Sequence, residues 1–158
     1  MKRRLVITIF ILFLTASIAA CNAAPNVEWE LSISGAVGDS YSITYQELLE
    51  LDQTDLENVF MDKSVGEDEY GSWSGVAVDH LLTKAAVDPD YVTVTAVAAD
   101  GYAIEISKEE LMGSIVALEE NGEWIYKADP EHGPIRLVCP QIPANRWVFK
   151  VMEIQVNK

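Results

Sequence analysis

Cysteine, histidine and basic residues are scarce in this chain of 158 residues. It contains two cysteines and two histidines, and its 11 lysines and arginines face 25 aspartates and glutamates, for a formal net charge of −14. A closed zinc site needs three or four cysteine or histidine ligands, and the sequence offers no such set. The acidic surplus argues against nucleic acid as a partner, because binding to its phosphates depends on lysine and arginine.

Sequence motifs of several enzyme and ion-binding classes are also absent. There is no G-x-S-x-G nucleophile turn, no phosphate-binding glycine loop, no D-x-[DN]-x-[DN]-G calcium loop and no internal repeat. The acidic residues therefore predict a solvated, self-repelling surface rather than a cation site. They cluster at 67–69, 109–110, 119–120 and at Asp129 and Glu131.

The N-terminal residues have the pattern of an export signal. Three basic residues at 2–4 precede an apolar run from Leu5 to Leu14 and a small-residue region at 15–20. The apolar run is shorter than the ~20 residues that a membrane-spanning helix needs. We therefore predict that residues 1–20 are a signal peptide.

Cys21 directly follows Ile18-Ala19-Ala20, which resembles a lipobox. In that motif the cysteine becomes the lipid-modified mature N-terminus, so we expect the membrane to be a partner through lipid on Cys21. The alternative is an ordinary cleaved signal that has a cysteine nearby. Both interpretations predict an exported domain, and lipidation would anchor it to the outer face of the cell membrane or to the periplasmic face. Without residues 1–20 the chain keeps 8 basic and 25 acidic residues, a formal charge of −17.

Residues 22–26 are expected to be a short linker, and residues 27–158 have the size of one domain. If Cys21 carries lipid, Cys139 has no cysteine left to pair with. Cys139 alternates with Ile135 and Leu137 in a strand-like run, which favours a buried small hydrophobe over a reactive nucleophile.

Local patterns predict two or three short helices. Thr44-Tyr-Gln-Glu47 is a capping box before Leu48 and Leu49, and apolar residues recur at helical spacing from Val78 to Ala85. Ser107–Glu110 is a second capping box, on a turn of helix that Gly113 would stop. His80 falls in the second helix, where a surface or interface position is the expected role.

The remaining patterns are those of strands. Residues 27–34 alternate between apolar and polar, and 91–98, 114–120, 135–139 and 147–156 have strand composition. Asp100-Gly101 and Asn121-Gly122 predict tight hairpin turns.

In the last strand, Trp147, Phe149 and Val151 share one phase whereas Ile154 and Val156 share the other, so we expect a bulge near Met152 or Glu153. The four tryptophans are expected to pack in the core. Taken together, the patterns predict an α+β fold, a β-rich domain with a mixed sheet.

Four blocks of the sequence, in the same order, resemble the sulfite-oxidase-type oxidoreductase molybdopterin-binding domain. Together they cover about residues 40–156, and the resemblance implies that family's fold. The blocks are Ser72-Trp-Ser-Gly-Val76 with Leu81-Leu82, read as a turn and helix; Asp100-Gly-Tyr102 with Ser107–Leu111; Asn121-Gly-Glu123 followed by His132–Pro140; and Asn145–Val151.

The resemblance also implies a metal ligand that this chain lacks. In the family, a pterin dithiolene and one protein cysteine hold the metal, and that cysteine lies upstream of the W-[ST]-G block. The corresponding stretch here, Asn58–Gly71, contains no cysteine. Asp62 and Ser64 would be hard ligands and Met61 a weak one, so no metal site is assigned.

The same resemblance supplies candidate cofactor-binding residues. It implies that Arg136 and His132, in H-G-P-I-R, contact the pterin, although this segment is one residue shorter than the family's and His132 therefore transfers poorly. Arg146 and Lys150 are further candidates, with Lys127 as an additional cation. Arg136 also has a structural interpretation, in which it ties strand ends to a buried carboxylate.

Three functions from different classes are compatible with the sequence. The favoured prediction is a membrane-tethered, non-catalytic binding or accessory domain, for which no cofactor is expected and no catalytic residue is assigned. The second is a molybdopterin-dependent oxidoreductase with altered metal ligation, or with Cys139 recruited as the ligand. The third is a structural envelope lipoprotein with an acidic surface.

Overall fold

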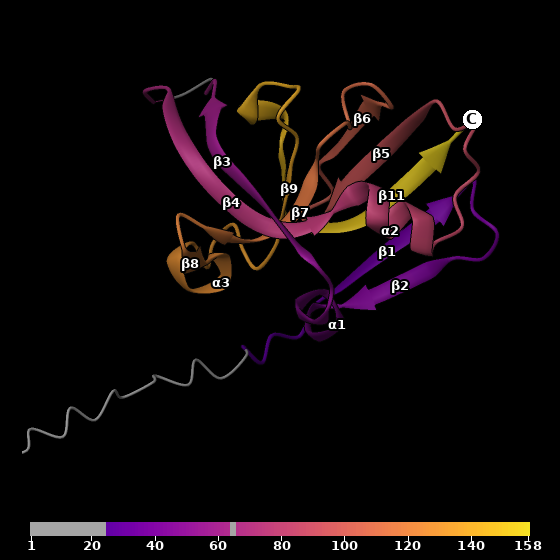
Figure 1. Ribbon diagram of the computed structural model, residues 1–158, viewed down its shortest axis with the longest axis horizontal. Helices are drawn as coiled ribbons and strands as arrows, with labels where there is room; N and C mark the ends of the chain where they lie inside the picture. Colours follow the sequence, from indigo (N-terminus) through magenta and orange to yellow (C-terminus); the bar gives the residue numbers. More distant parts are fainter. Residues whose placement is uncertain (1–24, 64–65) are drawn as a thin grey trace, which may run out of the picture.

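Two β-sheets enclose the hydrophobic core in the computed structural model, which describes residues 25–63 and 66–158 (Figure 1). The predicted signal, the predicted lipid site at Cys21 and Ser64 lie outside these residues. The first sheet has the order β2-β1-β11-β5-β6, and the second has the order β10-β9-β7-β4-β3 with β8 paired to β7. β1 pairs in parallel with β11, whereas the other pairs are antiparallel, so the predicted mixed, β-rich α+β fold is confirmed.

The strands of the first sheet are β1 (Glu30–Gly35), β2 (Tyr41–Thr44), β5 (Thr93–Ala98), β6 (Ala103–Ser107) and β11 (Val151–Asn157). Those of the second are β3 (Gln53–Met61), β4 (Glu69–Ala77), β7 (Ile115–Glu120), β8 (Glu123–Trp124), β9 (Arg136–Val138) and β10 (Val148–Phe149). The helices are α1 (Tyr45–Glu50), α2 (Val78–Lys84), α3 (Ile125–Ala128) and the 3-10 helix η1 (Ala144–Arg146).

Both predicted capping boxes form. At α1 the Thr44 amide donates to the Glu47 carboxylate at 2.8 Å, and the Glu47 amide donates to the Thr44 hydroxyl at 3.3 Å. Ser107 and Glu110 exchange the same two bonds at 3.0 and 3.2 Å. The predicted turn of helix is a hydrogen-bonded turn, in which the Leu111 amide donates to the Ser107 carbonyl at 3.0 Å, and it does not extend into a helix. Gly113 follows in the left-handed region, with φ of 72°, and ends this turn before β7 begins.

The two predicted hairpins also form, because their turn residues adopt positive φ. Gly101 has φ of 86° between β5 and β6, and Asn121 and Gly122 have φ of 51° and 79° between β7 and β8.

The last predicted strand is divided in two. Lys150 has φ of 48° and donates its amide to the Ile135 carbonyl, so the chain bends between β10 and β11. As a result Phe149 is 39% exposed while Trp147 and Val151 are buried, and the predicted common face of these three residues is wrong. The predicted bulge is confirmed, because the register of β11 against β5 shifts between Val151 and Glu153.

The segment Ser72–Val76, expected as a turn, lies inside β4. Gly75 permits the close approach of β4 to β7 that this strand requires. A Cβ atom there would lie 2.1 Å from the Val116 carbonyl oxygen, which no side chain tolerates. The register of β4 against β7 shifts at this point, between Ser74 and Gly75.

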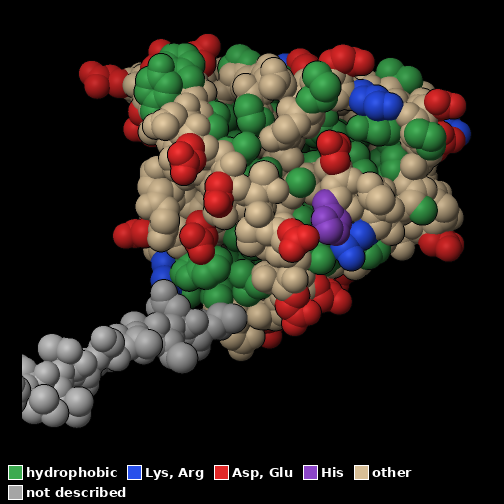
Figure 2. Space-filling model, in the orientation of Figure 1, with side chains coloured by type: hydrophobic (Ala, Val, Ile, Leu, Met, Phe, Trp, Pro, Cys, Tyr) green, Lys and Arg blue, Asp and Glu red, His purple; other side chains and the backbone are tan. Residues whose placement is uncertain are grey.

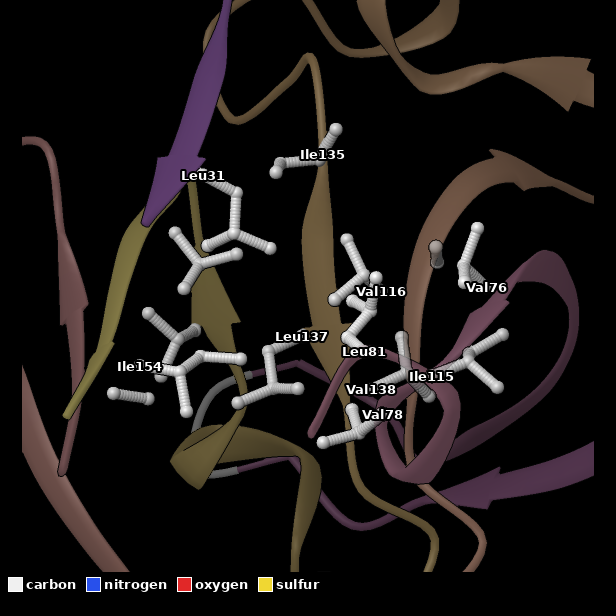
Figure 3. Packing of buried hydrophobic residues seen from close by; sticks show 14 of the residues in the cluster. Leu31, Val76, Val78, Leu81, Ile115, Val116, Ile135, Leu137, Val138 and Ile154 are labelled. Atoms are coloured by element: carbon white, nitrogen blue, oxygen red, sulfur yellow. The ribbon is translucent and has the colours of Figure 1, made fainter. Parts of the chain in front are cut away.

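Side chains from both sheets and from α2 meet in the core (Figure 3). Leu31 and Ile154 from the first sheet face Leu137 of the second, and Leu81 of α2 covers the adjoining region. Cys139 is fully buried, as predicted. Trp73 and Trp147 are buried and Trp29 and Trp124 partly buried, so the core role expected of the tryptophans holds fully for two of them. Within residues 25–63 and 66–158, no helix is long and apolar enough to cross a membrane.

Trp147 connects the core to the concave face described below. It is 3% exposed, its Nε1 donates to the Cys139 carbonyl at 2.9 Å, and its ring packs edge-on against Trp73 at 5.6 Å between ring centroids.

Trp147→Ala should lower the free energy of unfolding by about 3–5 kcal/mol in urea denaturation, because it leaves a large cavity. Met152→Ala, at a side chain 46% exposed, is the control and should change it by less than about 0.5 kcal/mol. Equal losses in the two variants would contradict this packing role.

Candidate functional site: an arginine held in an acidic pocket

A pocket of ≈ 430 Å³ opens on the second sheet, at the end where β4 begins and β7 ends. Its charged lining residues are Lys63, Glu69, Glu120, Asp129 and Arg136. Its apolar wall includes Met61, Trp147 and Phe149. The pocket therefore joins a strongly polar centre to the aromatic edge of the core.

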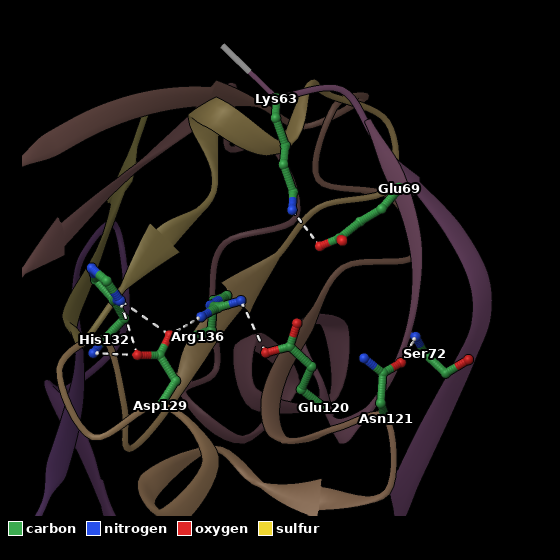
Figure 4. Close-up of polar contacts among 8 residues, drawn as sticks. All are labelled: Lys63, Glu69, Ser72, Glu120, Asn121, Asp129, His132 and Arg136. Atoms are coloured by element: carbon green, nitrogen blue, oxygen red, sulfur yellow. Dashed lines mark hydrogen bonds and ion pairs between the residues drawn. The ribbon is translucent and has the colours of Figure 1, made fainter. Parts of the chain in front are cut away.

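Arg136 is the centre of this pocket (Figure 4). It lies on β9 and its side chain is only 7% exposed. Nη2 donates to Asp129 Oδ2 at 3.1 Å, and Nη1 donates to Glu120 Oε2 at 3.4 Å. A buried guanidinium needs such partners, since leaving it unpaired would cost several kcal/mol, of order 3–5. These contacts match the structural interpretation of Arg136, in which it ties strand ends to carboxylates.

Two aromatic rings enclose the guanidinium. Its Cζ lies 4.1 Å from the Phe149 ring centroid and 4.8 Å from that of Trp73. The negative faces of the rings add cation–π attraction to the two ion pairs. Arg136 Nε is buried and has no hydrogen-bond partner among the described residues. The side chain thus combines packing on two rings with two ionic contacts.

The ion pair between Arg136 and Glu120 is unfavourable in net free energy, because burial removes the solvation of both charged groups. Desolvation raises the pKa of Glu120, with repulsion from Asp129 and Glu69 adding to it and Arg136 opposing it. Desolvation likewise lowers the pKa of Arg136 despite its two carboxylate neighbours. Both shifts are opposite to those of a net favourable pair, so the loss of solvation exceeds the mutual attraction.

His132 lies beside this cluster and contacts it through Asp129. Its Nδ1 is 3.0 and 3.1 Å from the two Asp129 oxygens, and its ring centroid is 5.0 Å from that of Phe149. The imidazole is exposed. His132 therefore holds Asp129 in place from the solvent side.

The other candidate cations lie elsewhere. Arg146 pairs with Glu110 at 2.7 Å and donates to the Glu105 carbonyl at 3.2 Å, and these contacts hold it toward β6. Lys150 is at the bend between β10 and β11, and Lys127 is exposed with its ammonium over the Tyr126 ring. The structure brings together Arg136 and His132, but it does not gather these three residues around the pocket lining. His80 is half-buried on α2, outside this pocket.

The sequence indicates a carboxylate partner for Arg136 in one interpretation, but it does not identify the residue. Glu120 and Asp129 were expected on the solvated surface, yet their side chains are only 22% and 30% exposed and both face the arginine. Carboxylates elsewhere do spread over the surface, as Figure 2 shows for one face. The signal that points to buried carboxylates is Arg136 itself, since a buried arginine in an acidic chain requires them. Which of the acidic residues it pairs with depends on the fold.

The stretch that corresponds to the family's ligand cysteine contains two of the weak candidate ligands among the described residues, Met61 and Asp62. Met61 is buried in the pocket wall and Asp62 is exposed. No group of three or more histidine, cysteine, aspartate or glutamate residues in the described part of the chain is placed to hold a metal ion. Cys139 is buried in the core, and burial raises the pKa of its thiol to about 11. A thiol with such a pKa is protonated at neutral pH and is a poor metal ligand.

Comparison with known proteins agrees with this fold. The family of oxidoreductase molybdopterin binding domains matches residues 18–158. This chain belongs to that family. No curated protein sequence matches the chain significantly.

Among solved structures, the crystal structure of the sulfane dehydrogenase SoxCD from Paracoccus pantotrophus is similar, at 25% sequence identity and a TM-score of 0.72. The match covers 82% of this chain and 38% of that one, so this family member spans well under half the length of that relative. The predicted resemblance to the molybdopterin-binding domain is thus confirmed for both the sequence family and the fold.

The residues of the pocket do not fit an anionic molybdopterin. Both terminal nitrogens of Arg136 are held by carboxylates, and the lining has three carboxylates against two cations. A phosphate that entered would meet a surplus of negative charge and a guanidinium that already pairs with two carboxylates. Among the described residues, the lining also has no thiolate for a soft metal. The pocket of this family member is organised by its own ion pairs.

Replacing Arg136 with methionine tests that organisation. At pH 7 Arg136→Met should lower the free energy of unfolding by about 3 kcal/mol, because Glu120 and Asp129 lose their shared cation. The loss should shrink toward pH 4. The pKa of Glu120 is already raised in the folded protein, and it rises further without the arginine. The folded variant therefore binds a proton more readily than the unfolded variant does, and this binding stabilises the folded state as the pH falls. Urea denaturation at both pH values measures this. An equal loss at the two pH values would show that Arg136 acts only through packing on Trp73 and Phe149.

Proposed function

We propose that this chain is an exported, membrane-tethered member of the molybdopterin-binding family with a non-catalytic binding or accessory role. The observation that carries the proposal is Arg136, the cation that the resemblance assigned to the pterin, held between Glu120 and Asp129. A side chain engaged in this way is a support for the pocket and not a free anion receptor.

Ligand chemistry supports the non-catalytic part of the proposal. The segment that should carry the metal-ligating cysteine has none, and the remaining thiol, Cys139, is sealed in the core. Recruiting Cys139 would require β9 and the segment after it to leave the sheet, which would also expose Trp147. A metal in this pocket would therefore have no thiolate ligand among the described residues, and Met61 would offer only a weak thioether.

The first 21 residues support the export and tethering part. A basic start, a short apolar run and a small-residue region before Cys21 are typical of lipoprotein signals. Lipid on Cys21 would hold the domain at the outer or periplasmic face of the membrane. The pocket favours a binding role over a purely structural one, because a structural envelope protein needs no charged concavity.

Cofactor content tests the proposal. The full chain, expressed in a host that makes molybdopterin and purified in detergent as that host processes it, should contain far less than one molybdenum or tungsten atom per chain and no pterin. Elemental mass spectrometry and pterin fluorescence after oxidative release measure both. A family member that has the ligand cysteine, produced in the same host, is the loading control. Near-stoichiometric metal and pterin in this chain would contradict the proposal and favour an oxidoreductase with altered ligation.

A further inference from the structure

We propose that Phe60 and Tyr70, a pair of exposed rings at the end of the β3–β4 hairpin, dock an arginine-rich segment of another exported protein. The two side chains are 52% and 67% exposed, and their ring centroids lie 5.3 Å apart. Neither residue lines the pocket around Arg136, so the inference does not depend on what that pocket holds. It rests on the proposed function only in placing the partner outside the cytoplasm.

This aromatic pair lies on the opposite face of the hairpin from the pocket. Phe60 pairs with Tyr70, and the next pair along the two strands, Met61 with Glu69, lines the pocket. Successive side chains of a strand point to opposite faces, so the rings point away from Arg136 and from the core. Figure 2 shows hydrophobic side chains gathered over this end of the hairpin. Aromatic residues are enriched at protein interfaces, which favours a contact site here.

The charges around the aromatic pair favour a basic partner. Asp62 and Asp68 are each two positions from one of the rings, and side chains at that spacing in an extended chain share a face. Both are exposed, as is Glu67. Among the residues that the structure describes, none of these three carboxylates takes part in an ion pair, whereas Lys63 pairs with Glu69. An incoming cation would therefore meet carboxylates that are still available.

Arginine suits this surface better than lysine. Its planar guanidinium stacks on the face of an aromatic ring and can pair with a carboxylate through two parallel hydrogen bonds. The aromatic pair supplies the rings, and Asp62 and Asp68 supply the carboxylates beside them. A lysine ammonium is a compact, strongly hydrated charge that would use the carboxylates but stack less well. The combination of rings and carboxylates therefore favours an arginine-rich segment.

Charge and strand geometry argue against a second copy of the chain as the occupant. Residues 21–158 carry a formal charge of −17, so two such surfaces repel each other. β3 is the outermost strand of the second sheet, but its register against β4 shifts between Leu56 and Val59, where Asn58 has φ of 54°. Such a bulge interrupts the row of backbone groups that an added strand would need. Recognition at this edge therefore depends on side chains.

The aromatic pair also lies far from the proposed lipid tether. Gln46 of α1 donates its side-chain amide to the Pro25 carbonyl at 2.6 Å, so the chain enters the domain beside α1. β3 starts shortly after α1 and, at the usual rise per residue, extends up to about 30 Å from it. Figure 1 shows α1 and the tip of the β3–β4 hairpin at opposite ends of β3. With lipid on Cys21, the rings would lie at the end remote from the membrane, where a partner can reach them.

The test is the fluorescence anisotropy of labelled hexa-arginine and hexalysine peptides, titrated with the full chain in detergent at physiological ionic strength. The two peptides have equal charge, so a difference between them reports stacking on aromatic rings and not general attraction to an acidic protein. The unaltered chain should bind hexa-arginine about fivefold more tightly than hexalysine. The double variant Phe60→Ser/Tyr70→Ser should bind both peptides equally, because the rings are gone.

Tyr102→Ser/Met112→Ser is the matched control. These side chains are 44% and 58% exposed and lie outside the hairpin, so the control removes a similar amount of apolar surface. It should keep the preference for hexa-arginine within about twofold. Circular dichroism checks that each variant is folded. Asp62→Asn keeps the test decisive should a double variant fail that check: it should weaken hexa-arginine binding by about two- to threefold, and Asp39→Asn, at an exposed residue between β1 and β2, should not.

Three results would overturn the inference. They are equal binding of the two peptides by the unaltered chain, equal loss of the preference in the two double variants, and a dimer in light scattering that Phe60→Ser/Tyr70→Ser dissociates. The last result would identify a second copy as the occupant. None of these measurements depends on cofactor content, so pterin and metal in the purified chain would refute the proposed function and leave this inference standing.

Discussion

The burial of Arg136 is the constraint on which the rest of the pocket depends. Its guanidinium joins the end of β7, through Glu120, to the segment after α3, through Asp129, and it lies between rings from β4 and β10. Desolvation outweighs the attraction between Arg136 and Glu120, but removing the cation would leave the Glu120 and Asp129 carboxylates without it. The cluster therefore determines the arrangement of the pocket more than it adds to stability.

This arrangement separates the fold of the family from its chemistry. The molybdopterin-binding fold rests on the pairing of strands in two sheets, on the close β4–β7 contact at Gly75 and on the buried Trp147. None of these contacts involves a cofactor. A fold can persist while the site built on it changes, because core packing and site chemistry depend on different residues. Here the core is well packed, and the terminal nitrogens of Arg136 pair with carboxylates from the same chain.

The features predicted correctly from the sequence are those that depend on neighbouring residues. The Thr44–Glu47 capping box, the two glycine hairpins and the bulge after Val151 are local, so short patterns contain the information. The positions missed depend on contacts between distant segments. The positive φ of Lys150 turns Phe149 toward Arg136, and Glu120 lies 16 residues from the arginine that it pairs with. Family resemblance identified Arg136 but could not show that its terminal nitrogens are occupied.

The most direct test of this account is a double-mutant cycle between Arg136 and Asp129. Free energies of unfolding would be measured at pH 7 for the unaltered chain, Arg136→Met, Asp129→Asn and the double variant. If the arginine is held by its own chain, the cycle should give a coupling of about 1.5–3 kcal/mol, as for a hydrogen bond between charged groups. Additive effects, with no coupling, would show that Asp129 does not hold the arginine and would contradict this account.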